Sequence, residues 1–179
     1  MRLFIAIDLS NECKNHIAHS MRELRPLWEK KGSIVPNENF HITLSFLGER
    51  DESEVHLIED AMKEIAASPF SIFLTGELGH FSRSGRNGNT YFLRLEKSSA
   101  LESLQWNLVE ALERRGFRLE KGRYKPHITI ARNSFLRDTE SSFSPFKEHV
   151  DSICLMKSER VNGKMVYTPV FKRSLNDPV

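Results

Sequence analysis

The chain has 179 residues. Its 26 lysines and arginines and 24 aspartates and glutamates give a net charge of +2, and a charge this small does not by itself indicate a nucleic-acid-binding protein. Hydrophobic residues make up 39% and charged residues 28%, a globular composition that excludes a disordered chain. This length suits one folded domain with a substantial core, so we expect a single domain over residues 1–179.

The two cysteines indicate a reducing compartment. Cys13 and Cys154 are far apart and belong to no Cys-x-x-Cys or Cys/His pattern, so neither a disulfide framework nor a zinc site is expected. The opening MRLFIAIDLS is interrupted by Asp8, and no apolar run is long enough to span a membrane. We therefore expect a cytoplasmic protein that is neither secreted nor inserted in a membrane.

The first predicted elements are a strand, a helix and a second strand. Residues 2–9 are apolar and strand-forming, and Ser10 is a suitable N-cap for a helix over 11–31 that Pro26 can kink or shorten. Over 40–47 the pattern has a period of two, which predicts a strand with one buried face. The alternating apolar residues are Phe40, Ile42, Leu44 and Phe46, and the polar ones are His41, Thr43 and Ser45.

A helix and two strands are predicted next. The helix starts after Gly48 with an acidic first turn and continues through Ile65. Residues 70–78 and 90–96 have the composition of strands, and a glycine- and arginine-rich loop, 80–89, joins them.

The last third of the chain predicts a further helix and three strands. The helix covers 98–115, and the first of these strands covers 127–131. The strand-like segments 150–161 and 165–171 flank the dipeptide Asn162-Gly163, which favours the tight turn of a hairpin. Hairpins indicate an α+β fold with antiparallel or mixed sheets rather than a doubly wound parallel sheet.

A weak internal repeat runs through this order of elements. The helix at 11–31 and the string FHITLSFLG are echoed by the helix at 98–115 and the string PHITIAR. Two similar lobes that face each other would explain the repeat. In a strand, the histidine and threonine of each His-Ile-Thr copy point to one face, while the isoleucine and the next aliphatic residue anchor the other face.

The two copies carry a complete set of groups for chemistry at phosphorus. A single histidine on a strand is usually structural, but two imidazoles on opposite sides of a cleft, with pKa values of about 6.5, can act as an acid and a base. His41 and His127 could thus move protons between water, a cyclic phosphodiester and a leaving ribose oxygen, without a metal or other cofactor. Thr43 and Thr129 could donate hydrogen bonds to the non-bridging phosphate oxygens.

The sequence resembles the two-histidine phosphoesterase superfamily, and within it the RNA 2′,3′-cyclic phosphodiesterases once called 2′-5′ RNA ligases. The resemblance covers nearly the whole chain and rests on RLFIAIDL, FHITLSFLGE, YKPHITIAR and the spacing of the two HIT copies. It implies two pseudo-symmetric α+β lobes whose antiparallel sheets, flanked by helices, enclose a central cleft. It also implies hydrolysis of RNA 2′,3′-cyclic phosphate termini to 2′-phosphomonoesters, with 2′-5′ ligation as a side activity.

The resemblance further implies a role for three residues. His41 is the proton donor to the leaving 3′ oxygen and His127 the proton acceptor from water, an order that spacing alone does not decide. Arg132 corresponds to a phosphate-binding residue. In a regular strand Arg132 would point away from His127, so this role requires a bend or a strand end.

Further contacts to RNA are candidates only, since each side chain is more often ordinary core or surface. Phe4, Phe46 and Tyr124 could stack on a terminal base, and Arg83 and Arg86 could hold the adjacent phosphate. Basic residues crowd the middle of the chain, although a solvated helix face explains those at 114–121 equally well. They are Arg83, Arg86, Arg94, Arg114, Arg115, Arg118, Lys121, Arg123, Lys125 and Arg132.

Two alternatives stay open. A non-catalytic RNA or nucleotide-binding module could use the HIT copies for phosphate recognition, although arginine or lysine would serve a pure binder better. An enzyme of the same mechanism could act on another cyclic phosphate or on a 2′-5′ oligonucleotide. The expected partners are RNA termini or nucleotides with a cyclic phosphate, bound by a monomer.

Overall fold

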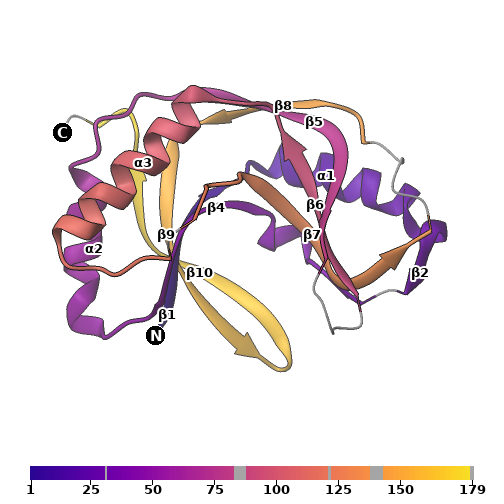
Figure 1. The fold of residues 1–179 in the computed structure, drawn as a ribbon, viewed down its shortest axis with the longest axis horizontal. Coiled ribbons are helices and arrows are strands. Elements are labelled where there is room, and N and C mark those ends of the chain that lie inside the picture. Colours follow the sequence, from indigo (N-terminus) through magenta and orange to yellow (C-terminus); the bar gives the residue numbers. More distant parts are fainter. Residues whose placement is uncertain (31, 83–87, 121, 138–142, 178–179) are drawn as a thin grey trace.

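Two antiparallel sheets form the framework of the chain (Figure 1). The computed structural model describes residues 1–30, 32–82, 88–120, 122–137 and 143–177. The four-stranded sheet has the order β10-β9-β1-β4, with β1 (Arg2–Asp8), β4 (His41–Glu49), β9 (Ser152–Val161) and β10 (Lys164–Ser174). The six-stranded sheet has the order β2-β7-β6-β5-β8, and β3 also pairs with β7. Its strands are β2 (Trp28–Lys30), β3 (Ser33–Ile34), β5 (Phe70–Phe81), β6 (Asn89–Leu95), β7 (His127–Leu136) and β8 (Phe146–Val150).

Three α-helices cover these sheets. They are α1 (Asn11–Glu23), α2 (Val55–Lys63) and α3 (Ser99–Arg114), and short 3-10 segments lie at Arg25–Leu27, Asn37–Asn39 and Glu52–Glu54. Figure 1 shows α2 and α3 on the side of the four-stranded sheet and α1 on the side of the six-stranded sheet. The α+β fold with antiparallel sheets is confirmed. No helix in the described part of the chain is long and apolar enough to cross a membrane.

The helices exchange sheets. Strand β1 belongs to the four-stranded sheet, but α1, which follows it, contacts β8 of the other sheet. Strand β6 belongs to the six-stranded sheet, but α3, which follows it, packs on β4. One apolar core contains residues of both sheets, among them Ile5, Ile42, Leu93 and Ile128. The two lobes are therefore interleaved and do not correspond to the two halves of the sequence.

The first predicted helix is shorter than expected. Its N-cap is confirmed, because the Ser10 Oγ accepts a hydrogen bond of 3.1 Å from the backbone N–H of Cys13. The helix ends at Glu23, since Pro26 cannot continue it, and Trp28 enters strand β2 instead of a last helical turn. The short strand β8 was not predicted.

The C-terminal hairpin is confirmed. Asn162 and Gly163 have φ angles of 50° and 79°, so both central residues of the turn are left-handed, as a type I′ turn requires. In Figure 1 the hairpin of β9 and β10 extends away from the body of the sheet.

Cys13 and Cys154 are both buried free thiols.

A β-bulge breaks the predicted alternation in β4. Opposite the adjacent residues Ile5 and Ala6 of β1 lie Ser45 and Thr43, so Leu44 is an extra residue. Leu44 and Ser45 are both buried, and the side chain of Phe46 is 55% exposed. The prediction that Phe46 belongs to the core face and Ser45 to the polar face was therefore wrong, because the bulge reverses the alternation after Leu44.

Strand β7 has a bulge at the equivalent position. Opposite the adjacent residues Tyr91 and Phe92 of β6 lie Ala131 and Thr129, so Ile130 is the extra residue. Ile130 and Ala131 are both buried and Arg132 is exposed. The bend that a phosphate-binding role for Arg132 requires is thus present, and Arg132 corresponds to Phe46 in the internal repeat.

Candidate active site

His41 is fixed at the first position of β4. Its Nδ1 donates a hydrogen bond of 2.7 Å to the carbonyl oxygen of Asn39. Its Nε2 lies 3.0 Å from the Oγ1 of Thr43. The imidazole also contacts the rings of Phe4 and Tyr167, at centroid distances of 5.0 Å and 5.3 Å. These contacts leave Nε2 as the nitrogen that can exchange a proton with a substrate.

His127 repeats the Nδ1 contact and the aromatic packing at the first position of β7. Its Nδ1 donates a hydrogen bond of 2.7 Å to the carbonyl oxygen of Lys125. The rings of Phe92 and Phe81 lie 5.1 Å and 5.3 Å from it. Because a carbonyl oxygen can only accept, Nδ1 carries the proton in each neutral imidazole and Nε2 carries the lone pair. Both copies of the motif therefore present the same nitrogen.

The pKa of both imidazoles lies below the ordinary value for histidine, and burial is the largest cause. The positive charge of Arg132 lowers the pKa of each further, which places this guanidinium within electrostatic reach of both rings. At His41 the carboxylate of Asp8 opposes this lowering of the pKa in part. Asp8 is the residue of β1 opposite His41, and Lys14 Nζ contacts its Oδ1 at 2.6 Å.

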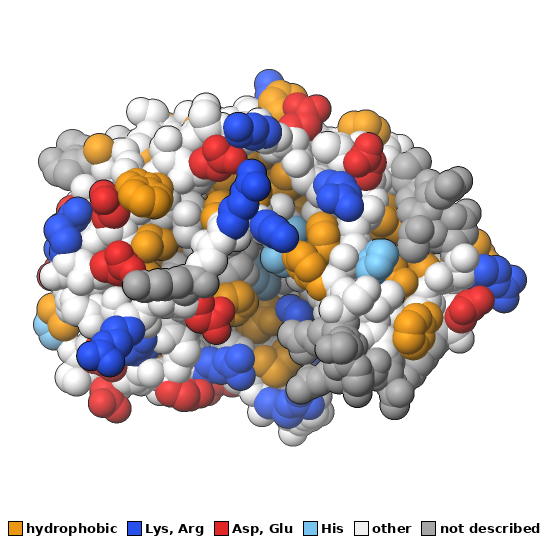
Figure 2. Space-filling model, viewed as in Figure 1, with side chains coloured by type: hydrophobic (Ala, Val, Ile, Leu, Met, Phe, Trp, Pro, Cys, Tyr) orange, Lys and Arg blue, Asp and Glu red, His pale blue; other side chains and the backbone are white. Residues whose placement is uncertain are grey.

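One pocket opens beside each of the two histidines. The larger, here called the arginine pocket, has a volume of about 600 Å³ and contains His41 in its wall. Its other distinctive side chains are three arginines and three aromatic residues, namely Arg2, Arg118, Arg132, Phe4, Phe46 and Tyr167. Figure 2 shows a hollow near the middle of the molecule, with histidine atoms visible in it and lysine and arginine side chains at its rim.

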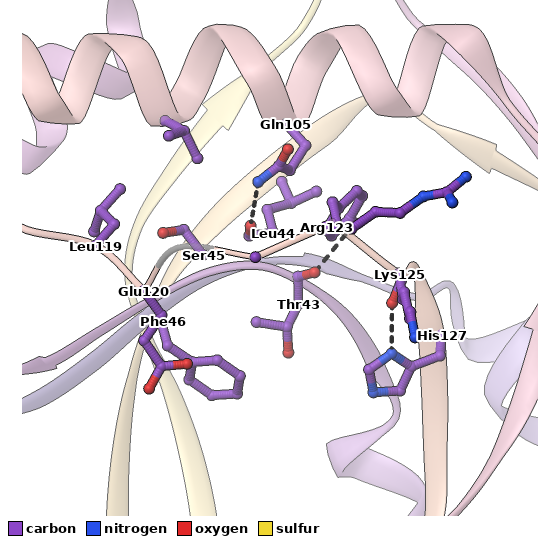
Figure 3. Close-up of a pocket in the computed structure, with 13 residues that line it drawn as sticks. Thr43, Leu44, Ser45, Phe46, Gln105, Leu119, Glu120, Arg123, Lys125 and His127 are labelled. Atoms are coloured by element: carbon purple, nitrogen blue, oxygen red, sulfur yellow. Dashed lines mark hydrogen bonds between the residues drawn. The ribbon is translucent and has the colours of Figure 1, made fainter. Parts of the chain in front are cut away.

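The smaller pocket, here called the α3 pocket, has a volume of about 300 Å³ and contains His127 and Thr43 in its wall. Gln105 and Val109 of α3 form part of its lining, together with the segment that precedes β7 (Figure 3). Phe46 and Glu120 line both pockets. The two pockets are therefore neighbours, and each contains one of the two histidines.

Side chains from outside the sheet hold the bulge in β4. The hydroxyl of Tyr124 donates to the carbonyl oxygen of Thr43 at 3.2 Å, and the side-chain amide of Gln105 donates to the carbonyl oxygen of Leu44 at 3.4 Å (Figure 3). Burial raises the pKa of Tyr124, so its hydroxyl stays protonated as a donor. In β7 the backbone N–H of Val35 donates to the equivalent bulge carbonyl at 2.9 Å.

The structure places the other residues predicted to contact RNA in different parts of the site. Phe4 and Phe46 line the arginine pocket, and the ring of Tyr124 lines the α3 pocket. Arg83 and Arg86 lie outside the described residues. Thr129 lies two residues after His127 on the same partly exposed face of β7.

The basic residues in the middle of the chain divide into two groups. Arg114 and Arg115 pair with Glu64, at 2.5 Å and 2.7 Å, and so belong to the contact between α3 and α2. Arg118 lines the arginine pocket, and Arg123 and Lys125 line the α3 pocket. Lys121 lies outside the described residues.

Sequence reasoning missed several residues around the histidines. Asp8, Tyr167 and Phe92 belong to other strands, and only the sheet register brings them to the motifs. Asn39 and Lys125 could have been found, because each stands two residues before a histidine and supplies the same carbonyl contact. Within the described residues, no group of three or more His, Cys, Asp or Glu is arranged to hold a metal ion.

Comparison with known proteins bears on what this geometry does. A family model described as the 2′-5′ RNA ligase superfamily matches residues 14–162. The RNA 2′,3′-cyclic phosphodiesterase of Bacillus subtilis is 32% identical over 97% of this chain and 96% of its own length, and that of Thermotoga maritima is 29% identical over 96% and 94%. The crystal structure of E. coli LigT complexed with 3′-AMP has a TM-score of 0.85 at 26% identity, covering 98% of both chains. The resemblance carried by the two HIT copies is confirmed, and the chain belongs to the 2′-5′ RNA ligase superfamily.

Proposed function

We propose that this chain hydrolyses the 2′,3′-cyclic phosphodiester at RNA termini to a 2′-phosphomonoester, by acid-base catalysis without a metal. One observation carries the proposal: His41 and His127 both use Nδ1 to bind a backbone carbonyl and so present Nε2 to a common centre within reach of Arg132. The relatives in Bacillus subtilis and Thermotoga maritima, named RNA 2′,3′-cyclic phosphodiesterase, support this substrate class.

The reaction needs one proton acceptor and one proton donor. Nε2 of His127 takes a proton from the attacking water while its oxygen bonds to phosphorus. The bond between phosphorus and O3′ breaks, and the protonated Nε2 of His41 gives its proton to O3′. Asp8 supports this order, because it lies opposite His41 in the pairing of β1 with β4 and its carboxylate offsets part of the lowering of the His41 pKa by burial.

The remaining residues bind the phosphate. Thr43 and Thr129 donate hydrogen bonds to the non-bridging oxygens, on which negative charge grows in the transition state. Arg132 adds a positive charge to the same group. A bound anion also raises the pKa of both histidines, which counteracts burial and lets His41 hold its proton near neutral pH.

The position of the RNA follows from the position of the leaving atom. O3′ belongs to the RNA and receives its proton from His41, so the ribose lies on the side of the arginine pocket. Arg2 and Arg118 can bind the phosphate that precedes the terminal nucleotide, and the exposed ring of Phe46 can stack on its base, whereas Phe4 is buried beneath His41 and Phe46.

We also propose that the chain acts as a cytoplasmic monomer. Both histidines and both pockets come from one chain, so catalysis requires no second copy. Two buried free thiols suit a reducing compartment.

The test measures release of 2′-phosphomonoester from an RNA oligonucleotide with a 2′,3′-cyclic phosphate end, in the presence of EDTA. We expect His41→Ala and His127→Ala each to lower kcat by about 10³-fold or more. His19→Ala, which removes an exposed histidine of α1, serves as the control and should keep wild-type activity. Absence of turnover by the wild type, or loss of activity with EDTA, would refute the proposal, and binding without turnover would favour the binding-module alternative.

A further inference from the structure

The hairpin of β9 and β10 extends beyond the strand that supports it. The pairing of β1 with β9 ends at Leu3 and Lys157. The residues beyond, here called the hairpin tip (158–167), pair with each other and form a two-stranded projection (Figure 1). A two-stranded hairpin alone is at best marginally stable in water. The position of this tip is nevertheless fixed, because the side-chain amide of Asn39 donates to the carbonyl oxygen of Met165 at 2.8 Å.

One face of the hairpin tip continues the wall of the arginine pocket. In an antiparallel pair, directly opposite residues share a face, as do alternate residues of one strand. Ser158, Met165 and Tyr167 line the pocket. Arg160 is paired with Met165, so it lies on the same face, and it stands about 7 Å beyond Ser158 along β9. Lys164 lies on the opposite face, which points away from the pocket.

The arginine pocket has room for the terminal nucleotide but not for a strand. Its volume of about 600 Å³ is that of a site for one small organic ligand. The preceding nucleotides lie beyond the phosphate assigned to Arg2 and Arg118, where Arg160 and Met165 come next along the wall. We propose that the hairpin tip binds the single-stranded RNA on the 5′ side of the terminal nucleotide, with Arg160 on a phosphate and Met165 against a base. The inference rests on the function proposed above.

The two side chains suit a single strand of any sequence. Arg160 is exposed, and its Nη1 donates one hydrogen bond of 3.3 Å to the carbonyl oxygen of Gly163, which does not neutralise its charge. A guanidinium has further N–H donors for phosphate oxygens. Met165 is partly exposed, and its flexible, polarisable side chain adapts to different partners. Contacts to phosphates and to base faces carry no direct sequence information, so binding should tolerate any sequence.

The first test measures how the reaction depends on the length of the substrate. Oligouridylates from a mononucleotide to a hexanucleotide, each ending in a 2′,3′-cyclic phosphate, are hydrolysed by the wild-type protein. We expect kcat/KM to rise from the dinucleotide to the hexanucleotide through a lower KM, because contacts remote from the reacting bond act before the transition state as well. Equal kcat/KM for these two substrates overturns the inference alone. Absence of hydrolysis of every substrate overturns the proposed function, and the inference with it.

The second test reverses one charge on each face of the hairpin tip. Arg160→Glu should lower the ratio of kcat/KM for the hexanucleotide to kcat/KM for the mononucleotide by about ten-fold at low salt. The control is Lys164→Glu, which makes the same charge change on the exposed opposite face and should keep the wild-type ratio. The mononucleotide does not reach the tip, so its rate reports the amount of folded enzyme in each variant.

The salt dependence gives a second measurement on the same variants. The decrease of log kcat/KM for the hexanucleotide with log salt concentration should be shallower in Arg160→Glu than in Lys164→Glu, because the lost phosphate contact releases fewer counterions. Arg160→Lys, which keeps the positive charge, should retain most of the wild-type ratio. Equal ratios in Arg160→Glu and Lys164→Glu would show that the strand leaves the pocket by another route and would overturn the inference.

Discussion

At the scale of single residues, the Nδ1 atoms of the two histidines are held in the same way. Each Nδ1 binds the carbonyl oxygen of the residue two positions before it, Asn39 or Lys125. Asn39 is itself held, because its side-chain amide donates to the carbonyl oxygen of Met165 at 2.8 Å. Both imidazoles are thus oriented by backbone carbonyl oxygens, which leaves Nε2 as the nitrogen that exchanges a proton in each.

The threonines provide the first prediction. Thr43→Val and Thr129→Val should each lower kcat for the cyclic-phosphate RNA by about 10²-fold, because valine keeps the shape but removes a hydrogen bond to the phosphate. Valine also favours strands, so the far-UV circular dichroism should not change. Thr168→Val, an exposed threonine of β10, is the control. An unchanged kcat would exclude the phosphate contact.

The buried imidazoles predict how stability depends on pH. Burial lowers the pKa of His41 and His127 in the folded state below the unfolded value of about 6.5. The unfolded chain therefore binds more protons in mild acid, and the free energy of unfolding falls as the pH drops below that value. Urea unfolding between about pH 7.5 and about pH 5.5 should show a smaller fall for His41→Gln than for the wild type. An equal or larger fall would contradict this.

At the scale of elements, the bulges decide which side chains reach the site. A period of two over 40–47 predicts strand β4, and no residue in it signals the extra position at Leu44. The bulge arises from pairing with β1 and from contacts with α3, and both are remote in sequence. Phe46 and Arg132 therefore appear on the catalytic face, although the local alternation predicts the opposite face.

The start of α1 provides a prediction about element stability. Ser10 caps this helix and also binds the carboxylate of Glu148 on β8 through its N–H at 2.6 Å and its hydroxyl at 2.8 Å. Glu148 is only 3% exposed, so loss of a partner is costly. Ser10→Ala should lower the free energy of unfolding by about 2 kcal/mol or more, measured by urea denaturation.

A matched control separates the cap from the carboxylate. Ser98 caps α3 by accepting a hydrogen bond of 3.2 Å from the N–H of Leu101. Ser98→Ala should cost about 1 kcal/mol, the usual value for a lost cap. Equal losses in the two variants would mean that the contact with Glu148 contributes nothing.

At the scale of the whole molecule, the interleaved lobes predict cooperative unfolding. The single domain over residues 1–179 stays a prediction, and unfolding tests it. In Trp106→Phe the remaining tryptophan is Trp28, which pairs with β7 and packs on Tyr91 at 5.6 Å. Its fluorescence reports on the six-stranded sheet, while circular dichroism reports on all helices. We expect the same urea midpoint from both signals, whereas two separate midpoints would mean that the lobes unfold independently.

The sequence by itself determined the reacting groups and most of the elements. Two identical HIT copies in strand patterns identified His41, Thr43, His127 and Thr129, because a motif that occurs twice is far less ambiguous than a single one. Caps and turn residues such as Ser10 and Asn162-Gly163 act within a few residues, so their local structures could also be predicted.

Only the tertiary structure decided how these parts form a site. The exchange of helices between sheets, the two bulges and the pairing of Asp8 with His41 depend on contacts between segments distant in sequence. The same contacts place the arginine pocket beside His41 and the α3 pocket beside His127. Local periodicity carries no information about such contacts, because they result from packing both sheets around one core.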